Sequence, residues 1–286
     1  MAARPRHVLI TGGSRGIGLA IAQLFAKTGY RCTLISRSEE ALKTAVSTLQ
    51  PLSNAPIPDQ STSPATSEHT PAPFKHTYIP GDISTQTHFW TSHPSTPFGS
   101  ALPKPPASNL THASRIDVLV NCAGITQSQL LVRTTDEDVT KIVNTNLTAM
   151  MLGTKFLIRQ GYLRGQGPSS TRGKEMMPVV INVASLLGLQ GGYGAVAYAT
   201  SKAGVLGFTR ALATEYASHH VRVNAIVPGY IETEMTRELD EEQLRQRIPL
   251  GRFGTPDEVA QAALFLAQNQ YAHNCVVNLD GGLSAV

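Results

Sequence analysis

Short apolar runs alternate with longer amphipathic segments along almost the whole chain, and this alternation restricts the possible folds more than any other feature. The apolar runs are rich in β-branched residues and nearly continuous, as in strands buried on both faces of a sheet. We expect strands at residues 8–11, 32–36, 77–79, 116–121, 179–185, 221–227 and 275–279. We expect helices at residues 18–28, 39–49, 136–160, 195–217, 241–247 and 256–268. The pattern predicts an α/β fold with a doubly wound, seven-stranded parallel sheet and helices on both faces.

Three stretches interrupt this alternation. Residues 51–73 and 91–114 are rich in Ser, Thr and Pro, and residues 165–177 form a shorter polar stretch. Such compositions cannot bury enough apolar surface to form a packed core. We therefore expect one domain, residues 1–286, in which these stretches are insertions that form loops at the rim of the sheet.

Charge and composition exclude several classes of function. The formal net charge is +4, without the clustered basic face that nucleic-acid binding needs, so we expect no nucleic-acid partner. No apolar run approaches the roughly 18 residues of a membrane span. The cysteines Cys32, Cys122 and Cys275 fit neither a disulfide set nor a metal site, and the histidines are scattered, so we expect no metal.

A glycine-rich turn at residues 11–18 lies between the first predicted strand and the first predicted helix. Glycines let a backbone approach a pyrophosphate, and the helix N-terminus supplies amide donors and the positive end of a dipole. The turn could be only a tight connection, but its place between a strand and a helix favours a dinucleotide site. The residues that we expect to form this site are Gly12, Ser14, Arg15, Gly16, Ile17 and Gly18.

The end of the second predicted strand, Ser36-Arg37, indicates which nicotinamide cofactor binds. NAD sites usually place Asp or Glu at this point to bind the ribose 2′-hydroxyl, and neither is present here. Arg37, together with Arg15 from the glycine turn, can pair with a 2′-phosphate through its planar guanidinium. The alternative for Arg37 is a solvated surface side chain. Two arginines beside a missing acid favour NADP(H).

Tyr198 and Lys202 are four residues apart in a predicted helix and therefore share one of its faces. A nearby ammonium favours the phenolate form of a tyrosine, which makes the phenol a better proton donor and acceptor near neutral pH. Such a pair is common by chance. Ser185 adds weight because it ends the fifth predicted strand, at the edge of a parallel sheet where ligands bind, and its hydroxyl can stabilise a developing oxyanion.

Asn146 falls inside the long helix predicted at 136–160. Asn is unfavourable in a helix interior, where it can hold a water molecule or kink the helix. A solvated polar position is the competing interpretation if Asn146 is considered alone.

With these residues in this order, the chain resembles the classical short-chain dehydrogenases/reductases over nearly its whole length. The resemblance is carried by the glycine turn, Asp82, Asn121-Cys122-Ala123-Gly124, Asn146, Ser185, Tyr198, Lys202 and Pro228-Gly229 followed by Thr233. Cys122 departs from the family pattern, which usually has a second Asn there. The resemblance implies a single-domain Rossmann fold that binds NADP(H).

The resemblance also implies a role for each site residue. Tyr198 would donate the proton in reduction, Lys202 would bind the nicotinamide ribose, Ser185 would orient the carbonyl, and Asn146 would hold a water in a proton relay toward Lys202. Other residues implied to contact the cofactor, beyond the glycine turn, are Ser36, Arg37, Asp82, Asn121, Ala123, Gly124, Tyr198, Lys202, Pro228, Gly229, Ile231 and Thr233.

Within the family, residues 130–134, 248–254 and 279–282 are similar to 3-oxoacyl-[acyl-carrier-protein] reductases and mitochondrial-type carbonyl reductases. This implies NADPH-dependent reduction of a 3-oxoacyl thioester in fatty-acid biosynthesis, by a soluble homotetramer in the mitochondrial matrix or cytoplasm. Two alternatives remain open. One is a carbonyl reductase for another ketone, quinone or secondary metabolite, and the other is a non-catalytic NADPH-binding subunit. Residues 234–247 are expected to cover the substrate.

Overall fold

A parallel sheet of seven strands organises the structure, a computed structural model that describes residues 4–52, 74–84, 89–106, 112–165, 176–237, 239 and 241–285. The strand order is β3-β2-β1-β4-β5-β6-β7. The predicted fold class is confirmed. The strands are β1 (His7–Thr11), β2 (Arg31–Ser36), β3 (Thr77–Pro80), β4 (Val118–Asn121), β5 (Val179–Val183), β6 (Arg222–Pro228) and β7 (Val276–Leu279).

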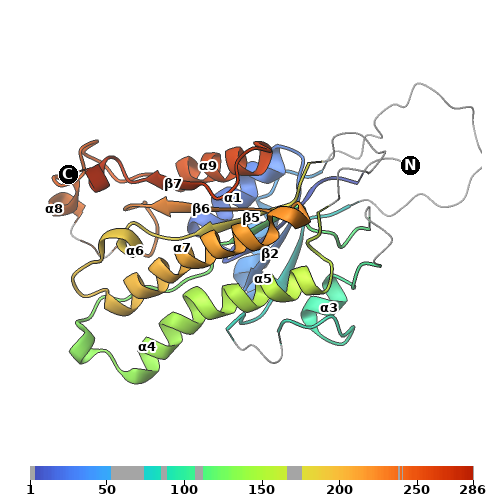
Figure 1. The fold of residues 1–286 in the computed structure, drawn as a ribbon, viewed down its shortest axis with the longest axis horizontal. Helices are drawn as coiled ribbons and strands as arrows, with labels where there is room; N and C mark the ends of the chain where they lie inside the picture. The colour runs from blue at the N-terminus through green and yellow to red at the C-terminus, as the bar shows by residue number, and fades with distance from the viewer. Residues whose placement is uncertain are drawn as a thin grey trace, which may run out of the picture.

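Helices cover both faces of the sheet, and alternate strand residues point to opposite layers (Figure 1). On β1, Val8 and Ile10 pack with the layer of α1 and α9, whereas Leu9 packs with the layer of α5 and α7. Because both layers are apolar, the central strands are apolar throughout, which explains their continuous pattern in the sequence. The longer helices are α1 (Gly16–Lys27), α2 (Glu39–Ser47), α4 (Asp136–Val143), α5 (Ala149–Arg159), α7 (Val196–Tyr216) and α9 (Pro256–Gln268).

Several shorter elements were not expected from the sequence, and two predicted helices, at 39–49 and 241–247, each end two residues earlier than expected. The predicted helix at 241–247 is α8 (Glu241–Arg245). The additional elements are α3 (Pro97–Ala101), α6 (Leu187–Gln190), a π-helical turn (Asn144–Thr148) and 3₁₀ turns at Leu131–Arg133, Ala217–His219 and Leu283–Ala285.

The expectation that residues 91–114 lack a packed core is wrong for their described part. Phe98 in α3 is fully buried, and its ring meets those of Phe156 and Tyr162 edge to face, with centroids 5.5 Å away in each case. The average composition of residues 91–114 does not reveal the buried Phe98, because Ser, Thr and Pro make up most of the stretch. Thr96 and Pro97 serve here as helix-starting residues, since the Thr96 hydroxyl accepts from the amide of Gly99. The other two stretches, 51–73 and 165–177, lie largely outside the described residues.

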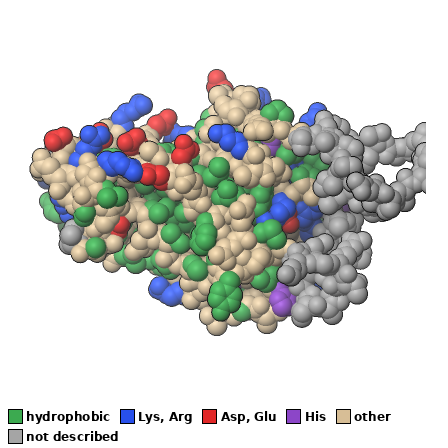
Figure 2. Space-filling model, turned by 90° about the horizontal axis from the view of Figure 1, so that it is seen from above, with side chains coloured by type: hydrophobic (Ala, Val, Ile, Leu, Met, Phe, Trp, Pro, Cys, Tyr) green, Lys and Arg blue, Asp and Glu red, His purple; other side chains and the backbone are tan. Residues whose placement is uncertain are grey.

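Charged side chains of both signs are intermixed on the face drawn in Figure 2, at the end of the molecule where Figure 1 places α8. Exposed ion pairs join Arg245 to Glu241 within α8, and Arg252 to Glu258 at the start of α9. Among the helices within the described ranges, none is long and apolar enough to cross a bilayer. The same ranges contain no group of three His, Cys, Asp or Glu side chains placed to hold a metal ion.

His7 is a buried titratable group at the start of β1. Its Nδ1 lies 2.9 Å from the carbonyl oxygen of Arg115 and 3.1 Å from the guanidinium of Arg31. Its Nε2 lies 2.8 Å from the Thr33 hydroxyl. Burial, followed by the nearby guanidinium of Arg31, holds the pKa of His7 well below 6.5. His7 is therefore neutral in the folded protein.

This burial predicts a pH dependence of stability. Below about pH 6.5 the unfolded chain protonates His7 and the folded protein does not, so the free energy of unfolding falls by up to about 1.4 kcal/mol per pH unit. Urea denaturation at several pH values between about 7.5 and 5 measures the slope. His7→Gln should show a smaller slope over the same window, and equal slopes in the two proteins would contradict the assignment.

Candidate active site

The glycine turn after β1 is packed so closely that only glycine fits at two of its positions. Gly12 has φ +71°, and a Cβ placed on it would lie 2.8 Å from the Cα of Ala123. A Cβ on Gly18 would fall onto the carbonyl oxygen of Gly12. The turn therefore lies directly against the backbone that follows β4.

The N-terminus of α1 has the features of an anion site. Its first amide groups have no intrahelical partners, and the Arg15 N-cap makes no side-chain hydrogen bond to them. The first turn of α1 also contains no acidic residue. In contrast, α2, α4 and α9 each begin at a hydroxyl that accepts from a helix amide, and these caps are Ser38, Thr135 and Thr255. The uncapped amides and the positive dipole end of α1 fit a pyrophosphate.

Polar side chains link the ends of β1, β4 and β5 beneath this turn. The hydroxyl of Thr11 accepts from the amides of Cys122 and Ala123 at 3.2 and 3.3 Å. The side-chain Nδ2 of Asn121 donates to the side-chain Oδ1 of Asn182 at 2.9 Å. These bonds hold the segment after β4 in a fixed position relative to the glycine turn.

Cys122, the departure from the family pattern, is a neutral thiol in this segment. Burial raises the pKa of Cys122 to about 11, although the ammonium of Lys202 acts in the opposite direction. A thiol with so high a pKa is a poor nucleophile at neutral pH. The substitution therefore leaves a small packing residue at this position.

Asn146 lies at the centre of the π-helical turn that separates α4 from α5, so the expected irregularity is present in the helix. Its Oδ1 accepts from the amide of Ile125 at 2.8 Å, and its Nδ2 donates to the carbonyl of Ile125 at 2.9 Å. Nδ2 also donates to the hydroxyl of Ser201 at 3.1 Å. Asn146 is thus a buried connection between the segment after β4 and α7, and the solvated interpretation is wrong.

Tyr198 and Lys202 occupy the first turns of α7, one helical turn apart. The Nζ of Lys202 lies 5.8 Å from the centre of the Tyr198 ring and donates to the carbonyl of Val183 at 2.9 Å. Lys202 is only 5% exposed. A Cβ on Gly124 would lie 3.5 Å from this Nζ and 3.3 Å from the Oδ1 of Asn146. Gly124 therefore lies beside both polar groups.

Ser185 lies two residues beyond the end of β5, rather than within the strand as predicted. The strand ends at Val183, whose carbonyl accepts from Lys202. The Ser185 hydroxyl accepts from the amide of Leu187 at 3.2 Å and is nearly buried. Ser185 and the ammonium of Lys202 therefore both lie at the carboxyl end of β5, the edge at which ligands bind in parallel sheets.

The residues expected to select the cofactor lie at the same edge. Arg37 is exposed directly after β2. Arg15 is exposed at the start of α1 and forms an ion pair with Glu234. Asp82 follows β3, and its Oδ1 accepts from the amide and hydroxyl of Ser84 at 2.9 and 2.7 Å. Ser36 ends β2, and its hydroxyl makes a long contact of 3.5 Å with the carbonyl of Ser38.

The segment after β6 brings the remaining expected residues toward the glycine turn. Pro228 ends β6, and the amide of Gly229 donates to Leu279 at 2.8 Å. Ile231 is buried. A Cβ on Gly16 would lie 3.4 Å from the methyl group of Thr233, so Thr233 faces the first turn of α1.

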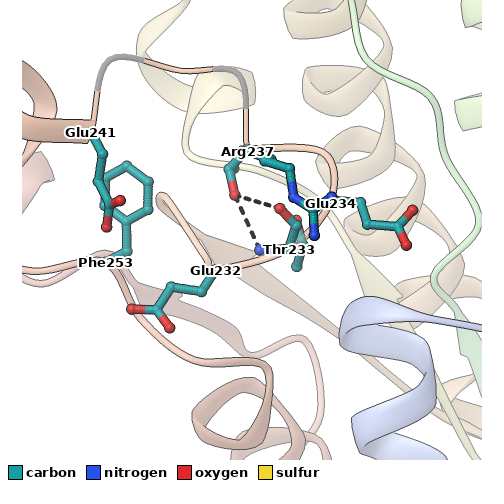
Figure 3. A pocket seen from close by; sticks show the side chains of 7 residues that line it. Glu232, Thr233, Glu234, Arg237, Glu241 and Phe253 are labelled. Atoms are coloured by element: carbon teal, nitrogen blue, oxygen red, sulfur yellow. Dashed lines mark hydrogen bonds between the residues drawn. The ribbon is translucent and has the colours of Figure 1, made fainter.

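A cavity of about 390 Å³ opens in the segment expected to cover the substrate. Figure 3 shows Glu241 and Phe253 on one side of this cavity and Thr233 and Arg237 on the other. The Thr236 hydroxyl donates to the carbonyl of Ile231 at 2.6 Å and accepts from the amide of Thr233 at 3.1 Å, which fixes the turn that leads into the cavity.

Sequence reasoning missed several residues that hold the site. Polar residues at the buried ends of apolar strands were a usable signal for Thr11 and Asn182, because a buried polar side chain needs a partner. Ser201 and Gln127 gave no such signal, since Ser201 accepts from Asn146 and Gln127 accepts from the start of α7, both in distant parts of the chain. Ser201 donates to the carbonyl of Tyr198 at 2.6 Å, and Gln127 accepts from the amides of Ala197 and Tyr198.

Comparison with known proteins shows the family of the chain. Residues 107–284 match the family model described as "Enoyl-(Acyl carrier protein) reductase", and residues 6–64 match the model described as "short chain dehydrogenase". The chain belongs to the short-chain dehydrogenase/reductase family. Members of this family are oxidoreductases with a Rossmann fold and a nicotinamide dinucleotide cofactor, and the chain is an enzyme of this class.

Three relatives within this family align with nearly the whole chain. The human 3-oxoacyl-[acyl-carrier-protein] reductase is 36% identical over 97% of both chains. Carbonyl reductase family member 4 of Danio rerio is 36% identical over 97% of this chain and 98% of its own. The 3-oxoacyl-[acyl-carrier-protein] reductase FabG of Chlamydia muridarum is 33% identical over 98% of this chain and 97% of its own.

The packing of the glycine turn leads to a prediction with a matched control. Gly29 also has positive φ, +82°, but a Cβ placed on it would meet no atom of the described residues within 4 Å. Gly29→Ala should lower the free energy of unfolding by about 1 kcal/mol, the cost of the backbone conformation alone. Gly12→Ala should lower it by about 2–4 kcal/mol because of the added contact with Ala123.

Cofactor binding, followed by the fluorescence of the reduced nicotinamide dinucleotide, should weaken in Gly12→Ala and remain unchanged in Gly29→Ala. Equal stability and equal cofactor affinity in the two variants would show that the close approach of the turn to the segment after β4 is not needed.

Proposed function

We propose that the protein reduces a 3-oxoacyl thioester, linked to acyl carrier protein or coenzyme A, to the 3-hydroxyacyl form with NADPH, in fatty-acid biosynthesis. The observation that carries this proposal is the convergence of Asn146, Ser185, Tyr198 and Lys202 on the carboxyl edge of the sheet, beside a turn that fits a dinucleotide. The names of the full-length relatives support the carbonyl substrate.

The roles of these residues follow from their chemistry. The chemistry that the bound cofactor supplies is hydride transfer to the carbonyl carbon. The Ser185 hydroxyl donates a hydrogen bond to the carbonyl oxygen and stabilises the negative charge that develops there. Tyr198 donates its phenolic proton to the same oxygen, which completes the alcohol. The ammonium of Lys202 stabilises the resulting phenolate, and Asn146 keeps the start of α7 in place.

The remaining contacts to the cofactor are assigned by position. We place the pyrophosphate at the glycine turn, the adenine at Asp82, the nicotinamide ribose at Lys202, and the carboxamide at Ile231 and Thr233. We place Asn121, Ala123 and Gly124 under the cofactor, between its pyrophosphate and its nicotinamide ribose. Pro228 and Gly229 precede the residues at the carboxamide.

The preference for NADPH rests on Arg15 and Arg37 together with the lack of a carboxylate at Ser36. The ion pair of Arg15 with Glu234 does not oppose this assignment, because both side chains are more than half exposed. Exposed pairs contribute only about 0–1 kcal/mol, and a dianionic phosphate is the stronger partner for a guanidinium.

Arg37→Asp should therefore lower the ratio of kcat/KM for NADPH to that for NADH by about ten- to hundredfold, because a charge-assisted contact is lost and a repulsion is added. Steady-state kinetics with both cofactors measures the ratio. Lys27→Asp makes the same change of charge at an exposed position in the last turn of α1 and should leave the ratio unchanged. An unchanged ratio in Arg37→Asp would rule out Arg37 as the 2′-phosphate ligand.

NADPH oxidation should be fastest, as kcat/KM, with an acetoacetyl thioester when this is compared with quinones, simple ketones and a crotonyl thioester. Tyr198→Phe should lower kcat by about 10²- to 10⁴-fold, the usual contribution of a general acid, and leave NADPH binding within a few-fold. Tyr271→Phe removes the hydroxyl of a 97% exposed tyrosine and should leave kcat unchanged.

The outcomes of these assays separate the alternatives. Faster turnover of a quinone would favour the general carbonyl reductase, which the name of the Danio rerio relative supports. Faster turnover of the crotonyl thioester would point to reduction of a carbon–carbon double bond. NADPH binding without turnover of any of these would indicate the non-catalytic subunit.

We also propose a homotetramer that forms through the two long helices and the C-terminal strand region, in the mitochondrial matrix or cytoplasm. Such an assembly would bury large apolar side chains that are exposed on these elements, which is favourable. They include Met151 in α5 and Val276 in β7.

A further inference from the structure

We propose that Gln127 is a positioning residue for Tyr198, which its side chain holds by capping the start of α7 from a separate segment of the chain. The kinetic part of this inference rests on the proposed function. The structural part concerns only the backbone of α7 and is independent of the substrate.

The start of α7 needs an external partner for its amides. The first amides of a helix have no intrahelical acceptor, and the N-cap residue, Ala195, has no side chain that could supply one. The Oε1 of Gln127 lies 2.8 Å from the amide nitrogen of Ala197 and 3.2 Å from that of Tyr198, and accepts from both. Gln127 thus fills the role of a cap, although it lies 70 residues before Ala197.

The Nε2 atom of Gln127 makes hydrogen bonds that fix the position of the Gln127 side chain. Its Nε2 donates to the carbonyl of Gln129 and to the hydroxyl of Thr134, both at 3.0 Å. Both donors and both acceptor sites of the amide are therefore used. Thr134 immediately precedes Thr135, the N-cap of α4, so Gln127 connects the start of α4 with the start of α7.

A second connection reaches the same helix through Asn146. Asn146 binds Ile125 through two hydrogen bonds and donates to Ser201, which in turn donates to the carbonyl of Tyr198. The amide of Tyr198 is thus held by Gln127, and its carbonyl by Ser201. Gln127 is therefore linked directly to the amide of Tyr198, and Ile125 is linked to its carbonyl through Asn146 and Ser201.

This arrangement explains why a remote side chain should affect turnover. The phenol of Tyr198 must lie within hydrogen-bond distance of a carbonyl oxygen that Ser185 also contacts, and a misplacement of about 1 Å can cost about 10²-fold in rate. A cap that only added stability would leave kcat unchanged below the melting temperature. A positioning residue lowers kcat while the protein remains folded.

The test uses Gln127→Met, which keeps a side chain of similar length and removes every hydrogen bond. Gln127→Glu keeps the acceptor for the two helix amides and removes the donors. Gln261→Met makes the same change as the first variant at an exposed position in α9. The measurements are kcat and KM with the best carbonyl substrate, NADPH affinity, and residue-resolved hydrogen exchange of the amides of Ala197 and Tyr198.

We expect Gln127→Met to lower kcat about ten- to hundredfold, with NADPH affinity within about twofold, and to speed exchange of both amides at least about tenfold. Gln127→Glu should restore the slow exchange and recover part of the lost kcat. Gln261→Met should match the wild type in all four measurements.

Unchanged exchange in Gln127→Met would show that the cap does not hold the start of α7. Faster exchange with unchanged kcat would leave Gln127 as a stabilising cap only, which also overturns the proposal. If the wild type reduces none of the carbonyl compounds, the proposed function fails, and the exchange data still decide whether Gln127 holds the backbone of Tyr198.

Discussion

The two hydrogen bonds between the Asn146 side chain and the backbone of Ile125 are the interaction on which the rest of the site depends. They join the π-helical turn to the segment after β4 through directional bonds, whereas apolar packing is non-directional. A bidentate amide fixes both distance and orientation. Because the same amide also donates to Ser201, the position of α7 is set relative to the segment after β4.

Buried polar groups of this kind are stabilising only when each has a hydrogen-bond partner. Here each side chain donates to the next one in a chain of hydrogen bonds. Asn121 donates to Asn182, and Asn182 donates to the hydroxyl of Thr209 in α7. Thr209 donates to the carbonyl of Val205 one turn earlier. The network therefore runs from β4 through β5 into α7, and it attaches the helix that carries Tyr198 to the sheet at a second point.

The sequence was sufficient to predict the sheet, because strands covered on both faces must be apolar at successive positions. It also predicted the glycine turn and the residues at the carboxyl edge, since these follow directly after recognisable strands. It was not sufficient for α3, whose burial depends on Phe98 fitting against Phe156 and Tyr162 from a distant part of the chain. Gln127 was missed for the same reason, because a side-chain cap that acts across many residues leaves no local pattern.

The π-helical turn at Asn144–Thr148 also determines the phase of everything that follows it in the helix. One additional residue in a helical turn rotates the later side chains by about 100°, a consequence of 3.6 residues per turn. This rotation allows Asn146 to face Ile125 while Met150, Thr154 and Leu157 of α5 are buried on the side of the sheet. A one-residue insertion or deletion between Asp136 and Arg159 would turn one of these two surfaces away from its partner. The chain can therefore vary in length at its loops far more readily than within this helix.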